Sequence, residues 1–202
     1  MVRREKLILE GKMQIKNINI EQLNVLYENH LEYDFPKSEL KSLSMMQSYM
    51  KQGIYTIYGL YEGEELLAYA LFMYNKDSGF QLLDYFASNR KYRSKGYGST
   101  LLEMLKQEDK ISQGYIIEVE TVRTAKNEEE KIQRERRIAF YEKNGLRKVT
   151  IRSSVFGVEF DILYLPLRWD GDDTQLYEEL KAIYMLMLGE ETFKKHTTIE
   201  ML

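Results

Sequence analysis

The sequence predicts an α/β (α+β) fold with a mixed, mostly antiparallel central sheet flanked by helices. Two observations carry this prediction. Three strand-like segments follow one another at residues 55–61, 65–74 and 82–87, with short turns between them, as in an antiparallel hairpin and its continuation. Helical patterns then alternate with strand-like segments at residues 115–121, 147–154 and 157–167, which adds layers of helix to the sheet.

Length and composition describe an ordinary globular chain. Its 202 residues suit one domain with an appendage, and its formal net charge of −3 gives no electrostatic case for nucleic acid or an anionic membrane. Zero cysteines exclude disulfides and thiol nucleophiles, and two separated histidines make a metal site unexpected. Met1 to Lys6 lack the apolar core of a signal peptide. We therefore expect a cytoplasmic protein with no nucleic-acid or membrane partner.

The N-terminal part is expected to form one strand and two helices. Residues 13–20 have a strand pattern, and residues 20–30 place apolar side chains on one helical face. Pro36 interrupts this pattern, and Ser38 is expected to cap a second helix rich in leucine and methionine. His30 is expected at a helix end, in a structural position.

A buried strand, a basic linker, a glycine loop and a helix follow one another between residues 82 and 105. Gly96 and Gly98 permit a sharp turn and let a ligand approach the main chain without meeting a Cβ atom. The helix that follows turns its unpaired N–H groups and its positive dipole end toward the loop. Four cations lie in the same stretch, namely Arg90, Lys91, Arg93 and Lys95. These features together predict an anion site for phosphates.

Three kinds of phosphate loop compete for this site. A Rossmann fingerprint is weak, because Leu101 stands where that motif has a third small residue, although two glutamates lie at a suitable distance downstream for a ribose. A Walker loop fails, because Ser99 rather than a lysine follows Gly98. The remaining pattern, Arg-x-x-Gly-x-Gly at residues 93–98, resembles the pyrophosphate loop of the GNAT superfamily of acyl-CoA-dependent N-acetyltransferases, of bacterial type.

A second segment strengthens this resemblance. Phe140 and Tyr141 precede the helix stop Asn144-Gly145-Leu146, which looks like the family's aromatic-Tyr pair before an Asn/His-Gly-aromatic stop, with leucine in place of the commoner Phe. The expected order β-α-α-β-β-β-α-β-α-β-β is also the topology of the GNAT fold. The resemblance covers roughly residues 13–168.

The resemblance implies acetyl-CoA as the cosubstrate and no metal. The main chain of Phe86 and Ala87 would pair with the pantetheine arm, and in the family this strand and the next splay apart, leaving main-chain groups to polarise the thioester carbonyl. The pyrophosphate would lie on the loop formed by Arg93, Ser94, Lys95, Gly96, Tyr97, Gly98 and Ser99. The implied reaction is transfer of the acetyl group to a primary amine of a small molecule or a peptide, by direct attack.

Two proton transfers accompany such a reaction, because the attacking ammonium loses a proton and the departing thiolate gains one. Tyr141 stands at the family position of the general acid, and a phenol with a pKa of about 10 is protonated at neutral pH; the alternative is a core tyrosine. Glu118 and Glu120 share one side of their strand. Either could attract the amine and accept its proton, directly or through water, and the alternative for each is a solvent-facing residue.

Two further segments have open roles. Residues 121–137 are dense in charge, which is typical of a solvated face but also compatible with a lid over the substrate entrance. Near the C-terminus, Asp172 is expected to cap a helix that ends at Gly189. Its apolar stripe consists of Leu176, Leu180, Ile183 and Met187.

This organisation predicts a GNAT domain at residues 1–170 and a C-terminal helical extension at residues 171–202. The extension would pack on the domain or on a second subunit, as in a homodimer. The alternative to an enzyme is a catalytically inactive GNAT-like module that binds acyl-CoA or another protein. The sequence leaves the acceptor amine open.

Overall fold

The computed structural model describes residues 13–202, so the expectation for Met1 to Lys6 lies outside the described residues. Within this range one sheet has the strand order β1-β2-β3-β4-β5-β7-β6-β8. Among the strand pairs whose register is described, β4–β5 is parallel and the other four are antiparallel. The predicted mixed, mostly antiparallel sheet with flanking helices is confirmed.

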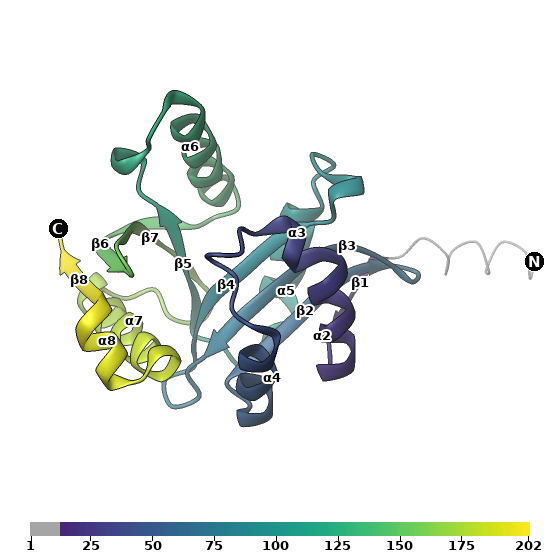
Figure 1. The fold of residues 1–202 in the computed structure, drawn as a ribbon, viewed down its shortest axis with the longest axis horizontal. Coiled ribbons are helices and arrows are strands. Elements are labelled where there is room, and N and C mark those ends of the chain that lie inside the picture. Colours follow the sequence, from purple (N-terminus) through teal and green to yellow (C-terminus); the bar gives the residue numbers. More distant parts are fainter. Residues whose placement is uncertain (1–12) are drawn as a thin grey trace, which may run out of the picture. The chain divides into compact units, whose positions relative to one another are not determined.

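Figure 1 labels the elements in chain order. The strands are β1 (Met13–Asn17), β2 (Tyr55–Glu62), β3 (Glu65–Tyr74), β4 (Phe80–Ser88), β5 (Gly114–Glu120), β6 (Arg147–Val155), β7 (Val158–Pro166) and β8 (Thr197–Met201). The helices are α2 (Ile20–Leu26), α3 (Glu32–Asp34), α4 (Leu43–Gln52), α5 (Tyr97–Glu108), α6 (Glu128–Lys143), α7 (Asp173–Leu188) and α8 (Glu190–His196). A π-helical turn, η1 (Tyr27–Leu31), and two 3-10 turns, η2 (Arg90–Tyr92) and η3 (Val122–Thr124), complete the set.

The chain forms two compact units, and the division passes through β3 and β4. The first unit comprises Met1–Phe72 and Tyr85–Asp109, and the second comprises Met73–Asp84 and Lys110–Leu202. The first therefore holds the predicted cofactor loop, and the second holds the predicted catalytic residues. The boundary at residue 170 between a GNAT domain and an extension stays a prediction.

The first unit confirms the expected first helix and corrects the second. Asn19 caps α2 by accepting a hydrogen bond from the main chain at 2.9 Å, and the helix passes into the turn η1, which contains His30. The prediction that Ser38 caps the next helix is wrong, because α4 begins four residues later, after a cap by Ser42. The Tyr85 hydroxyl holds the intervening segment out of the helix, since it donates to the Glu39 carbonyl at 2.8 Å.

The first unit also contains the predicted hairpin and the helix after the glycine loop. β2 and β3, the two segments of this hairpin, are neighbours in the sheet. β2 also pairs antiparallel with β1, from Met13 opposite Glu62 to Asn17 opposite Tyr58. α5 buries Leu101, Leu102 and Leu105, at the spacing that the sequence indicates for its apolar face. This helix includes the last three loop residues, Tyr97, Gly98 and Ser99, so the burial of its leucines fixes their position.

The second unit is organised around β5. Residues 80–83 of β4 pair in parallel with residues 114–117 of β5, while β7 pairs antiparallel with the other edge of β5. β6 lies beside β7, and β8 adds a short antiparallel strand to β6. In Figure 1, α7 and α8 lie beside these last strands.

α7 buries its predicted stripe within the same chain. Asp172 caps it by accepting from the Gln175 N–H at 3.0 Å. Leu176, Leu180 and Ile183 are buried, while Met187 at the end of the stripe is half-buried. The sequence did not predict α8 and β8, which are short and rich in charged or hydroxyl side chains. Whether the chain also pairs with a second copy stays a prediction.

Candidate functional site

The glycine loop has the predicted sharp turn at Gly96 but not at Gly98, which lies in the first turn of α5. Gly96 has φ +87°, a left-handed conformation that glycine adopts without strain. Ser94 has φ +64°, which is uncommon for a residue with a Cβ atom. A Cβ atom added at Gly96 would meet nothing within 4 Å. The space beside the main chain is therefore open to a ligand.

The N-terminus of α5 lacks the side-chain cap that the other long helices have. Ser42, Asn127 and Asp172 cap α4, α6 and α7 through side-chain oxygen atoms. α5 begins after Gly96, and no side chain accepts a hydrogen bond from its first turn. The N–H groups of Tyr97, Gly98 and Ser99 have no partner within the helix. Together with the helix dipole, they form the donor set that a phosphate requires.

The basic linker before the loop is anchored on a buried carboxylate. Asp34, at the end of α3, has a side chain that is 1% exposed, and it accepts a hydrogen bond from Arg93 Nη2 at 2.8 Å. The Nε atom of Arg90 lies 3.5 Å from the same carboxylate oxygen. The Tyr69 hydroxyl donates to the second oxygen at 2.7 Å. Arg93 therefore braces the loop against α3 instead of standing alone as a phosphate ligand.

The buried Tyr69 is protonated in this arrangement. Burial raises its pKa above the ordinary value, and the neighbouring Asp34 carboxylate raises it further. His30 lies edge-on to Tyr69, with ring centroids 6.0 Å apart, and burial lowers the pKa of its imidazole. The group is a structural anchor beneath the linker, in agreement with the structural reading of His30.

The Lys95 side chain of the loop lies near an aromatic ring. The Lys95 Nζ atom is 5.2 Å from the centroid of the Tyr92 ring, and Tyr92 lies edge-on to Tyr97, with centroids 6.1 Å apart. All three residues are next to the loop in sequence. Lys95 is exposed, so its ammonium can approach an anion bound at the loop.

Phe86 and Ala87 lie near the end of β4, in the first unit with the loop. Both residues are partly exposed, whereas most of the preceding β4 residues are buried. The described β4–β5 ladder covers Phe80 to Leu83 on the β4 side. The role of Phe86 and Ala87 toward the pantetheine arm stays a prediction.

Tyr141 lies in the last turn of α6 and is buried. Its ring packs edge-on against Phe140, with centroids 5.2 Å apart. Burial raises the pKa of Tyr141 to about 12, although the Arg137 guanidinium opposes this shift. The phenol therefore keeps its proton at neutral pH, as a general acid must. Burial is also what a core tyrosine shows, so the catalytic role stays a prediction.

Glu120 is held by cations from α6. Arg134, which is 6% exposed, donates from Nη2 to Glu120 Oε1 at 2.8 Å, and it also contacts Glu130 at 2.6 Å. Arg137 lies 3.6 Å from the other oxygen of Glu120. The charge of Glu120 is thus engaged in joining α6 to the end of β5. Part of the charge-dense segment is therefore structural, and the reading of residues 121–137 as a lid stays open.

Glu118 has different partners from Glu120, although both residues are partly exposed and share one side of β5. The Tyr184 hydroxyl from α7 donates to Glu118 Oε1. Ser153 Oγ from β6 lies 3.5 Å from the same oxygen and 2.8 Å from the Tyr184 oxygen. The described hydroxyl partners of Glu118 are neutral, whereas Glu120 faces two guanidinium groups.

Sequence reasoning missed the residues that support the predicted site. Asp34, Arg134, Ser153 and Tyr184 each reach their partner from a distant element. Tyr184 had a local signal, since it directly follows Ile183, a member of the predicted apolar stripe of α7. Arg134 lies four residues from Glu130 on α6, but no spacing relates it to Glu120. Asp34 and Ser153 have no spacing that relates them to the residues they contact.

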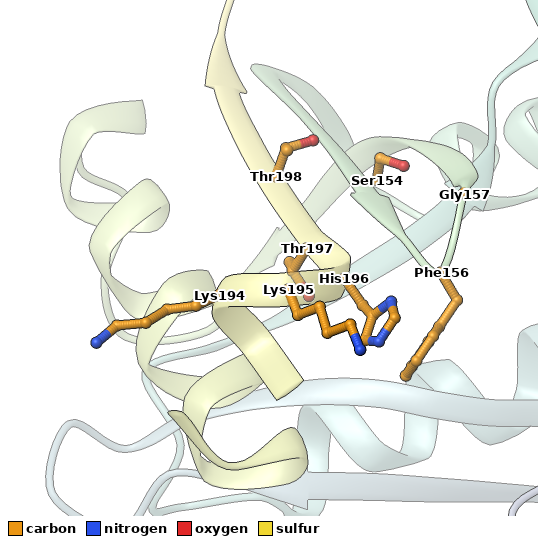
Figure 2. Close-up of a pocket in the computed structure, with 8 residues that line it drawn as sticks. All are labelled: Ser154, Phe156, Gly157, Lys194, Lys195, His196, Thr197 and Thr198. Carbon is orange, nitrogen blue, oxygen red and sulfur yellow. The ribbon is translucent and has the colours of Figure 1, made fainter. Parts of the chain in front are cut away.

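Two hollows occur in the described part of the chain. One, of about 710 Å³, lies in the first unit between α2, η1, the β2–β3 turn and the linker, and His30 lines it. The other, of about 350 Å³, lies in the second unit between the β6–β7 turn and the α8–β8 junction. Figure 2 shows this second hollow, where the Phe156 and His196 rings lie side by side. Neither hollow is lined by any of the predicted site residues.

Residues 13–202 contain neither a candidate metal site nor a helix that could cross a membrane. No group of three or more His, Asp or Glu side chains in this range is arranged to hold a metal ion. No helix in the same range is long and apolar enough to cross a membrane. The cytoplasmic location stays a prediction.

Comparison with known proteins finds a family model that matches the middle of the chain. The model described as an acetyltransferase (GNAT) domain matches residues 53–147, a span that holds the glycine loop, both glutamates and Tyr141. The sequence has no match among curated proteins.

Solved structures share the fold. An acetyltransferase of the GNAT family from Bacteroides thetaiotaomicron has a TM-score of 0.68 at 20% identity, over 89% of this chain and 99% of that one. The ribosomal-protein-S18-alanine N-acetyltransferase of Escherichia coli has a TM-score of 0.53 at 20% identity, over 80% and 98%. A Bacillus subtilis acetyltransferase solved with CoA has a TM-score of 0.51 at 16% identity, over 77% and 99%. The family model over residues 53–147 and the shared fold confirm the resemblance to GNAT acetyltransferases.

Proposed function

We propose that the chain transfers the acetyl group of acetyl-CoA to a primary amine by direct attack. The observation that carries this proposal is the uncapped N-terminus of α5 behind the open glycine loop. Such a terminus is an anion site, and it lies within the span that matches the GNAT domain. The cosubstrate supplies an activated acetyl thioester.

The loop residues fit the phosphates of CoA. The N–H groups of Tyr97, Gly98 and Ser99 would donate to the pyrophosphate, and Lys95 would add a positive charge. Arg93 would act chiefly by holding the loop in shape, because its guanidinium is engaged by Asp34 at 2.8 Å. We further propose that the main chain of Phe86 and Ala87 aligns the pantetheine arm.

Tyr141 would supply the proton that the departing sulfur needs. Because burial raises the pKa of Tyr141 to about 12, the phenol is protonated throughout the neutral range. As the amine nitrogen forms its bond to the carbonyl carbon and the C–S bond breaks, the phenol proton passes to sulfur. The nitrogen still carries a second proton after the new bond has formed, and this proton would pass, directly or through water, to the phenolate.

Glu118 is the better candidate for the base. The amine arrives as an ammonium and must lose a proton before its nitrogen lone pair can attack. The Tyr184 hydroxyl from α7 contacts the Glu118 carboxylate and would orient it, whereas the two oxygen atoms of Glu120 lie 2.8 Å from Arg134 and 3.6 Å from Arg137. We therefore assign proton acceptance, directly or through a water, to Glu118 and a structural role to Glu120.

The acceptor is a primary amine of a small molecule or of a peptide. An acidic group at the site favours amines that are cationic before attack. The N-acetyltransferase of Escherichia coli that shares the fold is described as acting on an alanine of a ribosomal protein. Low identity to that enzyme leaves both classes of acceptor open for this chain.

The test is release of free CoA from acetyl-CoA in the presence of a pooled amine panel. The panel should combine polyamines, amino acids, aminoglycosides and peptides with free N-termini. Amine-dependent release is the expected result. CoA binding without release for any acceptor would contradict the proposal and favour a GNAT-like module that binds acyl-CoA without turnover.

A further inference from the structure

A chain of three oxygen atoms joins the C-terminal helix to the proposed base. Tyr184 of α7 is 0% exposed and Ser153 of β6 is 2% exposed, so both hydroxyls are removed from bulk water. The Tyr184 hydroxyl contacts Glu118 Oε1 and lies 2.8 Å from Ser153 Oγ. Both residues lie outside the residues 53–147 that match the family model.

Proton counting fixes the direction of these hydrogen bonds. A tyrosine hydroxyl has one proton and two acceptor positions, and the carboxylate of Glu118 can only accept when ionised. Burial and the Glu118 carboxylate both raise the pKa of Tyr184 well above its ordinary value, so the phenol keeps its proton. Tyr184 therefore donates to Glu118, and the single Ser153 proton is directed to Tyr184 at 2.8 Å or to Glu118 at 3.5 Å.

We propose that Tyr184 is a positioning residue for acetyl transfer, which orients the Glu118 carboxylate and stabilises its ionised form through α7. This inference rests on the proposed role of Glu118. A glutamate on a strand has three side-chain torsions, and a buried donor from a packed helix restricts them. The C-terminal helix would thus be a working part of the site and not only a cover for the sheet.

The packing of α7 gives this donor a fixed position. Tyr184 follows Ile183 directly, and both are buried together with Leu180, one turn earlier. A side chain held by such neighbours cannot swing away without exposing apolar surface. The hydroxyl is therefore preorganised toward Glu118, which is the arrangement that an aligned catalytic carboxylate needs.

Other charged groups near Glu118 come from three elements. Asp84 of β4 lies on the same face, because the parallel register places Leu82 opposite Ile116 two residues earlier on each strand. Glu120 lies two residues along β5, and Arg134 and Arg137 of α6 contact it. None of these groups changes when the Tyr184 hydroxyl alone is removed, so the experiment isolates its effect.

The experiment compares Tyr184→Phe with the control Tyr177→Phe, which removes a hydroxyl from a partly exposed position on the same helix. We expect Tyr184→Phe to lower kcat roughly tenfold, as loss of a supporting hydrogen bond commonly does, and to move the acidic limb of the pH–rate profile to higher pH. Removing a donor disfavours the ionised carboxylate, which gives the sign of this change. The control should match the wild type.

A second readout is independent of turnover. The side-chain carboxyl signal of Glu118, assigned in the NMR spectrum by its loss in Glu118→Gln, should titrate at higher pH in Tyr184→Phe than in the wild type. Ser153→Ala should give a smaller change in the same direction. The rise in melting temperature on adding CoA should be the same in all variants, which also shows that they are folded.

The outcomes separate this inference from the function on which it rests. If Glu118→Gln alters the pH profile but Tyr184→Phe has wild-type kinetics, the positioning role is wrong while Glu118 remains the base. If Glu118→Gln has a wild-type profile, the proposed base is wrong, and the positioning role falls with it. An unchanged Glu118 titration in Tyr184→Phe overturns the inference even in the absence of any turnover.

Discussion

The glycine loop and the glutamate pair of β5 differ in how the sequence encodes them. The loop is proposed to bind through main-chain groups, and its residues 93–99 are consecutive. The two glutamates are two positions apart on one strand, yet one faces hydroxyls from α7 and β6 while the other faces cations from α6. A site made of main-chain groups can thus be predicted from neighbouring residues. The role of a side chain depends on contacts with elements that are distant in sequence.

Charge shows the same contrast. In the loop, the Arg93 guanidinium forms an ion pair with the buried Asp34 carboxylate. The N–H groups of α5 are the proposed anion site. In the glutamate pair, the Glu120 carboxylate forms an ion pair with Arg134. Glu118 is the proposed base. In both regions a charged residue that the sequence indicated for the site forms an ion pair with a distant element.

The largest expected effect concerns the dependence of the glutamate pair on the C-terminal helix. Truncation at Gly171 removes α7 and its buried Leu176, Leu180 and Ile183. Burial of each such side chain contributes about 1.5–3 kcal/mol, and a whole domain is stable by only about 5–15 kcal/mol. We expect loss of cooperative unfolding and aggregation in size-exclusion chromatography. A soluble truncated chain with wild-type activity would contradict the role of α7.

Gly96→Asp should break the loop and leave the glutamate pair intact. The substitution forces a side chain into a left-handed conformation at φ +87° and places a negative charge beside the phosphate site. CoA at about 100 times its Kd stabilises the wild type by about 2.7 kcal/mol, and this gain should vanish in a thermal-shift assay. Gly157→Asp, at φ +82° in the β6–β7 turn, is the matched control and should keep the CoA-dependent shift.

Tyr141→Phe tests the second unit without disturbing the loop. General acid catalysis commonly contributes about 10²- to 10⁴-fold, so kcat should fall by that order while CoA affinity is retained. Because the pKa of Tyr141 is about 12, the wild type should show no loss of kcat from phenol ionisation up to pH 10. An alkaline limb centred below that pH, absent in Tyr141→Phe, would show that the phenol is less shielded than its burial indicates.

Glu120→Gln should have the smallest effect of the series. Arg134 would lose one charged partner but keep Glu130 at 2.6 Å and the Thr121 carbonyl at 2.6 Å. A hydrogen bond to a charged group contributes about 1.5–3 kcal/mol, so the melting temperature should fall by several degrees, measured by calorimetry. A stability equal to that of the wild type would mean that Glu120 does not hold α6.

The sequence predicted most of the fold because the fold is made of local signals. Glycine positions, apolar stripes and the Asp172 cap each reside within a few neighbouring residues, and the structure reproduces them. The start of α4 was missed because the hydroxyl of Tyr85, 46 residues from Glu39, decides where the helix begins. α8 and β8 were missed because a five-residue strand acquires its stability from pairing with β6.

The candidate site shows the same difference between features that depend on neighbouring residues and features that depend on distant ones. The turn at Gly96 and the helix behind it could be predicted from local signals, whereas the positive φ of Ser94 could not. The binding role of residues 93–99 stays a prediction. Strand alternation placed Glu118 and Glu120 on one side of β5 but could not distinguish them. The distinction depends on Tyr184, 66 residues from Glu118 in sequence, and on Arg134 in the middle of a charge run that resembles a solvated surface.

The pH dependence of kcat/KM in Glu118→Gln and Glu120→Gln tests most directly whether distant partners assign these two carboxylates to different tasks. Glu118→Gln should lose the acidic limb of the profile and raise KM for a cationic amine, because both the base and the attracting charge are removed. Glu120→Gln should keep the wild-type profile, with its cost seen in stability alone. Loss of the acidic limb in Glu120→Gln with a wild-type profile in Glu118→Gln would reverse the assignment and contradict the account.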